Sequence, residues 1–200
     1  MDLIITLLSF LLILTAGYMH ARLVYMGIIQ IHPVSWTIWT LTAIAIMFSY
    51  RSMRTGYAFY ITIGNIIFPA FNLLLSFRQK TKLGLSSWDY AACTLGILSL
   101  IYWYLVQHDP ESSAYANYIA IFADLCALIP TFLMVRKNPM IEKPLPWIIF
   151  SLGFIINILS LHDHSLSSYI LPIYMFIGSN IIAIIQIRFR MKHNIQEPWY

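Results

Sequence analysis

Seven apolar stretches divide this 200-residue chain, and nearly all of its basic residues lie in the segments on one side of them. Each stretch is close to the roughly 20 residues that an α-helix needs to cross the hydrocarbon core of a bilayer. They cover residues 3–21, 33–50, 57–77, 88–106, 113–135, 145–161 and 168–187. The sequence therefore predicts an all-α integral membrane protein with seven transmembrane helices.

The basic residues also predict how the chain is oriented in the membrane. If the first residue lies outside, only Arg51 and Arg54 face outward, and the other ten lysine and arginine residues face inward. The ten are Arg22, Arg78, Lys80, Lys82, Arg136, Lys137, Lys143, Arg188, Arg190 and Lys192. Because cytoplasmic segments carry an excess of basic residues, we expect an external N-terminus, a cytoplasmic C-terminus and a location in the cell (inner) membrane.

Composition excludes several classes of protein. With 60% hydrophobic and 10% charged residues, the chain leaves no room for a soluble domain. The net charge of +4 belongs to the cytoplasmic helix ends, so it does not indicate nucleic-acid binding. No basic segment precedes the first stretch, which we therefore expect to be a helix rather than a cleaved signal peptide. We expect the polar tail from Lys192 to Tyr200 to be frayed.

Candidate catalytic and metal sites are weak in this sequence. Cys93 and Cys126 fall inside predicted spans and suggest no disulfide or metal site. The tripeptide His162-Asp163-His164 lacks the helical i, i+4 spacing of a metal motif. The last span has no lysine that could bind retinal, and no catalytic constellation is evident. We expect neither a cofactor nor a metal, and we expect the protein not to be an enzyme.

The chain contains an internal repeat. Residues 32–39 align with residues 143–150 at an offset of 111, so that a proline, a tryptophan and a second aromatic residue coincide. Residues 60–64 align with residues 174–178 at an offset of 114, which places three extra residues around 162–168. There are two alternative explanations for these alignments. Apolar segments can resemble one another by chance, and aromatic residues are common at membrane interfaces.

A repeat of this size predicts a particular architecture. Three spans end on the opposite side of the membrane from their start, so one extra span is needed for a second copy to have the same orientation. We therefore expect parallel triple-helix-bundle repeats in a 3+1+3 arrangement. The first repeat covers residues 1–84, the linker helix residues 85–110, and the second repeat with a short tail residues 111–200. Such a chain can also form a homo-oligomer.

This pattern resembles the PQ-loop and SWEET superfamily of solute transporters over nearly the whole chain. The family's Pro-Gln pair corresponds to Pro130-Thr131, which a basic loop follows, whereas the first repeat has Met19-His20 at the equivalent position. The resemblance implies transport of a small polar solute across the lipid bilayer by alternating access. The missing proline puts symmetric rocking of the two repeats in doubt. A membrane subunit or sensor that docks to a partner membrane protein, without transporting, is the alternative function.

The resemblance also suggests substrate-binding residues. Sugar carriers of the family place an asparagine in the third helix of each repeat, and Asn65 and Asn180 lie at similar depths here. They are one position out of register, because an offset of 114 from Asn65 leads to Ser179. Interhelical hydrogen bonding is the alternative role for both asparagines.

Asp124 is the only carboxylate near the centre of a span. A charge there costs on the order of 3 kcal/mol, so the group must be protonated, paired or hydrated. We expect it to bind substrate and to exchange a proton during transport. A neutral acid that donates to a backbone carbonyl, or a contact with a partner subunit, are the alternatives.

Five residues are candidates for a hinge or gate, and each also has a simpler role. Proline is frequent in membrane helices, histidine near a helix end can be interfacial, and tryptophan at a helix start is typical of the aromatic belt. The candidates are Pro130, Thr131, His20, Trp36 and Trp147.

Overall fold

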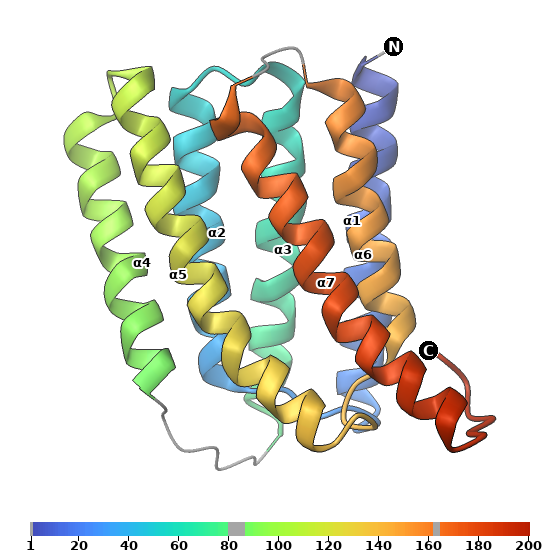
Figure 1. Cartoon of the computed structure of the whole chain (residues 1–200). Coiled ribbons are helices and arrows are strands. Elements are labelled where there is room, and N and C mark those ends of the chain that lie inside the picture. Colours follow the sequence, from blue (N-terminus) through green and yellow to red (C-terminus); the bar gives the residue numbers. More distant parts are fainter. Residues whose placement is uncertain (1, 80–86, 162–164) are drawn as a thin grey trace.

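The computed structural model describes residues 2–79, 87–161 and 165–200, and within them seven α-helices form one bundle (Figure 1). The helices are α1 (Asp2–Tyr25), α2 (Pro33–Ser52), α3 (Phe59–Ser76), α4 (Ser87–Val106), α5 (Pro110–Lys137), α6 (Pro144–Asn157) and α7 (Leu166–Lys192). Short 3-10 turns precede α3 (Gly56–Ala58) and follow α6 (Ile158–Ser160). The predicted all-α class and seven helices are confirmed. Lys80, Lys82 and the tripeptide 162–164 lie outside the described residues.

Five of these helices, α1, α3, α4, α5 and α7, are long and apolar enough to cross a membrane. The sixth helix, α6, has only 14 residues before its 3-10 turn. The second, α2, has 20 residues, but its hydroxyl-bearing and tryptophan side chains make it less apolar. The composition of five helices therefore indicates an integral multi-pass membrane protein. Membrane crossing by all seven helices stays a prediction.

The helices α1, α2 and α3 of the first half of the chain and α5, α6 and α7 of the second half are here called the two sets of three, and α4 lies between them in the sequence. The third helix, α3, packs against α1 and α2, and α7 packs against α5 and α6. Between the sets, α1 packs against α6 and α2 packs against α5. The remaining helix, α4, lies at the edge of the bundle against α5 and α2 (Figure 1).

Small residues form the buried face of α5. Ala116, Ala120, Ala123 and Ala127 are all fully buried, at spacings of four, three and four residues that place them on one side of the helix. In a bilayer the lipid is as apolar as leucine, so helices associate through close packing of small side chains. The large apolar side chains lie largely on the outer surface, as Leu105 illustrates with 72% exposure.

Three of the helices begin at a proline, namely Pro33, Pro110 and Pro144. Proline suits this position because the first helical N–H has no partner within the helix. In front of two of them, the side chains of His32 and Asp109 accept hydrogen bonds from the backbone N–H three residues later. These caps explain why α2 and α5 start where they do.

The C-terminal tail folds back onto the start of α6. Lys143 Nζ lies 3.0 Å from Glu197 Oε2, and the Arg190 guanidinium donates to the Glu197 carbonyl at 2.9 Å. The ammonium group of Lys143 lowers the pKa of Glu197. The backbone N–H of Leu145 donates to the Trp199 carbonyl at 3.2 Å. The expectation of a frayed tail is therefore wrong, because charge pairing and a backbone hydrogen bond hold it.

Replacement of Gly153 should disturb the contact between α6 and α1. A Cβ atom at this position would lie 2.8 Å from Ile13 Cγ1 and 3.0 Å from the Ser9 carbonyl oxygen. The backbone atom cannot move aside as a flexible side chain can, so we expect Gly153→Ala to lower the free energy of unfolding by about 1–3 kcal/mol. Denaturant titration in detergent micelles measures this.

Gly96→Ala is the matched control for this prediction. A Cβ atom at position 96 would lie 3.5 Å from Thr42 Cγ2, which is an ordinary van der Waals distance. We expect this variant to unfold like the wild type, or to be up to about 1 kcal/mol more stable because alanine favours a helix. Equal stability of the two variants would contradict the close contact between α1 and α6.

Candidate functional site

A cavity of about 40 Å³ lies among α2, α3, α5, α6 and α7. This space is enough for a few water molecules but not for a sugar or an amino acid. Six of the residues that line it are aromatic, namely Trp36, Trp39, Phe68, Trp147, Phe150 and Tyr174. The cavity therefore lies between the two sets of three helices.

Three polar side chains, Asn65, Asp124 and Ser179, interrupt the aromatic wall. Each is about 4% exposed. Among the described residues that line the cavity, none is a lysine or an arginine. The cavity can thus offer an amide, a hydroxyl and a carboxyl group to a small polar molecule, with no fixed positive charge beside the carboxyl group.

Asp124 receives a hydrogen bond on each carboxyl oxygen. The Thr42 hydroxyl donates to Oδ1 and the Tyr174 hydroxyl donates to Oδ2, both at 2.8 Å. The Trp39 indole N–H donates to the Asp124 backbone carbonyl at 3.3 Å. Hydroxyl groups can both donate and accept, so the same contacts serve a charged or a neutral carboxyl group. The buried acid is therefore held by hydroxyl donors from α2 and α7 rather than by a cation.

Asn180 does not line the cavity, in contrast to Asn65. Its side-chain nitrogen donates to the Phe176 carbonyl on its own helix at 2.7 Å. Ser179, the position in strict register with Asn65, lines the cavity instead. Successive residues of a helix point about 100° apart, so a shift of one position is enough to turn a side chain away. Two of the three predicted substrate-binding residues, Asn65 and Asp124, thus lie together.

Trp36 and Trp147 lie inside the bundle. They are 2% and 5% exposed, line the cavity, and pack on the His20 ring with centroid distances of 4.9 and 5.8 Å. Residues of an aromatic belt face the lipid headgroups. The belt interpretation is therefore wrong for these two tryptophans, whose position on the cavity wall leaves a role as a gate open.

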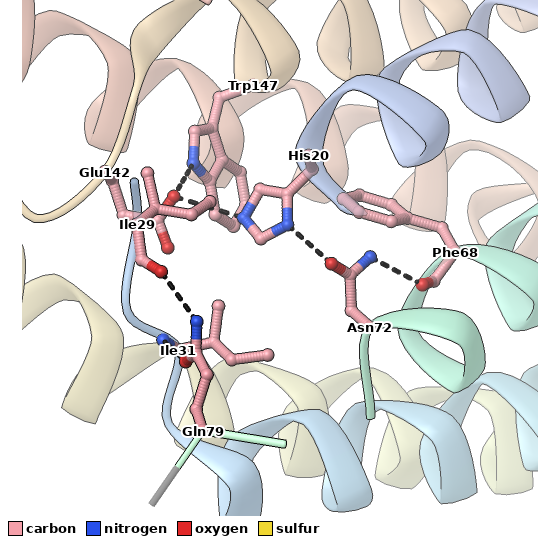
Figure 2. A network of polar contacts seen from close by, with 8 residues as sticks. All are labelled: His20, Ile29, Ile31, Phe68, Asn72, Gln79, Glu142 and Trp147. Atoms are coloured by element: carbon pink, nitrogen blue, oxygen red, sulfur yellow. Dashed lines mark hydrogen bonds and ion pairs between the residues drawn. The ribbon is translucent and has the colours of Figure 1, made fainter. Parts of the chain in front are cut away.

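His20 is fully buried beside this aromatic wall (Figure 2). Its Nδ1 lies 2.7 Å from Asn72 Oδ1, and its Nε2 lies 3.1 Å from Glu142 Oε2. The Trp147 indole N–H donates to the same glutamate oxygen at 3.3 Å. The interpretation of His20 as an interfacial residue is thus wrong, because the loop before α6 carries Glu142 inward to meet it.

Pro130 and Thr131 are buried on α5 outside the cavity wall. The helix continues through Pro130 to Lys137, although proline removes one backbone hydrogen bond there. Their proposed role as a hinge stays a prediction.

Sequence reasoning did not connect four polar residues to Asp124 or His20. Thr42, Asn72 and Tyr174 lie within apolar stretches, and nothing in the sequence ties them to either residue. Glu142 lies in a segment that reads as an exposed loop. The only available signal was that Tyr174 belongs to a repeated segment.

Comparison of the chain with protein-family models, curated proteins and solved structures finds no match in any of the three. The site is therefore interpreted from its own geometry.

Loss of the Thr42 hydroxyl should destabilise the protein. Thr42→Val keeps the shape of the side chain but leaves Oδ1 of Asp124 without its donor. We expect the free energy of unfolding in detergent to fall by about 1–2 kcal/mol, because a buried carboxyl oxygen loses its hydrogen bond. The control is Thr15→Val, since the exposed Thr15 hydroxyl bonds only to the Leu11 carbonyl of its own helix. Equal losses in the two variants would contradict this account.

Proposed function

We propose that the protein is a membrane transporter that carries a small polar solute by alternating access. The observation that carries this proposal is the cavity between the two sets of three helices, which is lined by Asp124 and by several aromatic side chains. Binding sites of secondary transporters lie at the interface of such structural repeats. In the conformation described, the cavity has room only for water, so the solute enters when one end of the bundle opens.

The repeated positions of the sequence support a pair of related triple-helix units. Residues aligned at the offsets of 111 and 114 line the same cavity. The aligned pairs on its wall are Trp36 with Trp147, Trp39 with Phe150, and Asn65 with Ser179. The shared location of these three pairs supports the proposal that the alignment reflects a structural repeat.

The packing of the helices supports the same arrangement. If α1, α2 and α3 are exchanged for α5, α6 and α7, the contact of α1 with α6 becomes the contact of α5 with α2. The contacts of α3 with α1 and α2 likewise become those of α7 with α5 and α6. The remaining helix, α4, then acts as the connector that gives both units the same orientation, as the resemblance to the PQ-loop and SWEET superfamily implies.

The two proposed units differ in ways that bear on the mechanism. Asp124 is matched by the apolar Ile13 at an offset of 111, and Pro130 by Met19. Only the second unit therefore has a carboxyl group on the cavity. The first unit has its helix-interior proline in α3 instead, at Pro69 on the cavity wall. We propose that α5 bends at Pro130 during opening.

Asp124 is the proposed proton-coupling residue. Its two hydroxyl partners can satisfy either protonation state, and the cavity gives it access to water. A carboxyl group in a nonpolar interior binds a proton more readily than one in water. A proton could thus bind when the cavity opens to one side and leave on the other, with Asn65 and Asp124 both contacting the solute.

A docking role for Asp124 in a non-transporting subunit fits the geometry less well. The side chain is 4% exposed, and both of its oxygens are bonded within the chain. A partner protein at the outer surface of the bundle would not reach it.

Asp124→Asn should remove the pH dependence of transport while the fold remains intact. The amide keeps the size of the side chain but cannot bind and release a proton near neutral pH. The measurement is uptake of radiolabelled sugars, amino acids and vitamins into proteoliposomes, with and without an inward proton gradient. We expect wild-type uptake of one solute to increase with the gradient, and uptake by Asp124→Asn to be the same with and without it.

The control for this experiment is Glu111→Gln, which neutralises an exposed acid at the start of the same helix. It should retain the response to the gradient. Gradient-driven uptake that persists in Asp124→Asn would rule out the proton role, and absence of uptake for every solute in the panel would count against transport of these three classes.

A further inference from the structure

The amide of Asn72 determines that His20 Nδ1 carries a hydrogen. Asn72 Nδ2 lies 2.9 Å from the backbone carbonyl of Phe68, which can only accept, so the amide nitrogen must face this carbonyl. The amide oxygen then faces His20 Nδ1 at 2.7 Å (Figure 2). Because that oxygen is only an acceptor, Nδ1 must be the donor.

The other ring nitrogen of His20 faces a carboxyl oxygen. Nε2 lies 3.1 Å from Glu142 Oε2, which also accepts from the Trp147 indole. Since Nδ1 already holds one hydrogen, a hydrogen bond at Nε2 requires one more proton, on the imidazole or on the carboxyl group. In both cases the His20 and Glu142 side chains together have no net charge.

Removal of this proton would leave an unfavourable contact. The Nε2 lone pair would point at a carboxylate 3.1 Å away, and the pair would have a net charge of −1. His20 is 0% and Glu142 3% exposed, so water could not compensate the charge. A buried charge without a partner is strongly destabilising. The contact between His20 and Glu142 therefore requires the proton.

No other titratable side chain contacts this pair in the part of the chain that the structure describes. His20 otherwise touches Asn72 and the rings of Trp36, Phe68 and Trp147. The charged or titratable groups on the surrounding elements are engaged elsewhere or exposed. These are Arg22 at the surface, His32 with Ser35, Asp124 with Thr42 and Tyr174, Lys143 with Glu197, and Arg190 with the Glu197 carbonyl.

The pair lies directly behind one wall of the cavity. Trp36, Phe68 and Trp147 line the cavity and also pack on the His20 ring, with centroid distances between 4.9 and 5.8 Å. On the far side of the pair is the end of the bundle at which α1 and α5 finish and α2 and α6 begin, here called the α5–α6 end. The aromatic rings and the pair therefore lie between the cavity and this end.

Other contacts close the same end. The Gln79 side chain, just after α3, donates to the carbonyl of Val24 near the end of α1. It also donates to the carbonyl of Ile29 in the loop that follows α1 (Figure 2). That loop contacts the loop before α6 through a hydrogen bond of 3.4 Å from the Gln30 N–H to the Ile141 carbonyl. The backbone bond contains no titratable group, whereas the link between His20 and Glu142 joins two titratable side chains.

We propose that His20 and Glu142 form a binding site for a single shared proton, and that this proton latches the α5–α6 end of the bundle closed. The latch joins α1 of the first three helices to the loop before α6 of the second three. Its opening would connect the cavity to that end of the bundle, and this part of the proposal rests on the proposed transport function. Raising the pH removes the proton and releases the latch, whereas lowering the pH closes it.

The proton site is tested by ¹⁵N NMR of histidine-labelled protein in nanodiscs, with His20 assigned sequentially. We expect Nδ1 to stay protonated over the whole pH range in which the protein is folded, and the Nε2 resonance to shift in one step as the pair loses its proton. In Glu142→Gln this step should move by at least one pH unit or disappear. An unprotonated Nδ1, or the same step in both proteins, would overturn the proposal.

The latch is tested by distance measurement between spin labels at Arg22→Cys and Lys137→Cys, two exposed positions at the α5–α6 end. The background carries Cys93→Ala and Cys126→Ala. We expect a longer distance population to grow as the pH of the wild type is raised, and we expect no such pH dependence in Glu142→Gln. Glu197→Gln, which removes a carboxylate near the same end, should behave like the wild type. A distance that is independent of pH in the wild type would overturn the latch.

Trp147→Phe provides a second variant if Glu142→Gln fails to fold. It keeps an aromatic ring but removes the indole donor to Glu142, so the pair should retain its proton to higher pH and the longer distance should appear later. Neither measurement requires transport. A shared proton without uptake of any solute in the panel would leave the proton site intact and count against transport of these solute classes. Uptake with a pH-independent distance would instead support the transporter and overturn the latch.

Discussion

Two carboxyl groups, Asp124 and Glu142, lie inside an apolar bundle, and the contacts described bind neither to a lysine or an arginine. In such surroundings each buried oxygen needs a hydrogen-bond donor, because water is scarce and an unpaired charge is costly. The donors come from helices of both sets, as Thr42 on α2, Tyr174 on α7, His20 on α1 and Trp147 on α6. The hydrogen bonds to Asp124 and Glu142 therefore constrain the relative positions of these four helices.

Close packing of small residues makes this arrangement possible. The alanine face of α5 lets α2 and α4 approach closely. Near the cavity many of the side chains are instead large and aromatic, and a small space remains among them. One wall of rings, formed by Trp36, Phe68 and Trp147, lies between the cavity, which Asp124 lines, and the His20 and Glu142 pair. The two buried carboxyl groups therefore lie on opposite sides of that wall.

The positions of the helices could be predicted well from the sequence. The direction in which a single side chain points could not. The apolar stretches gave all seven helices, because runs of about 20 apolar residues have few other ways to satisfy their backbone groups in lipid. Helix ends were less certain: α5 and α7 extend past their apolar stretches into charged residues, since i to i+4 hydrogen bonds continue regardless of polarity. Asn180 was assigned to the cavity on depth alone, although the repeat register already indicated Ser179.

What the sequence determined by itself is that the chain enters a membrane as a helical bundle, that its halves share matched segments, and that Asp124 must find compensation within the bundle. These follow from local chemistry, because hydropathy and the cost of a buried charge need no knowledge of neighbours. Only the tertiary structure decided which groups provide that compensation, and that Glu142 turns inward from a loop to His20, 122 residues away in sequence. Contacts over such separations depend on how helices rotate and pack, which composition and periodicity leave open.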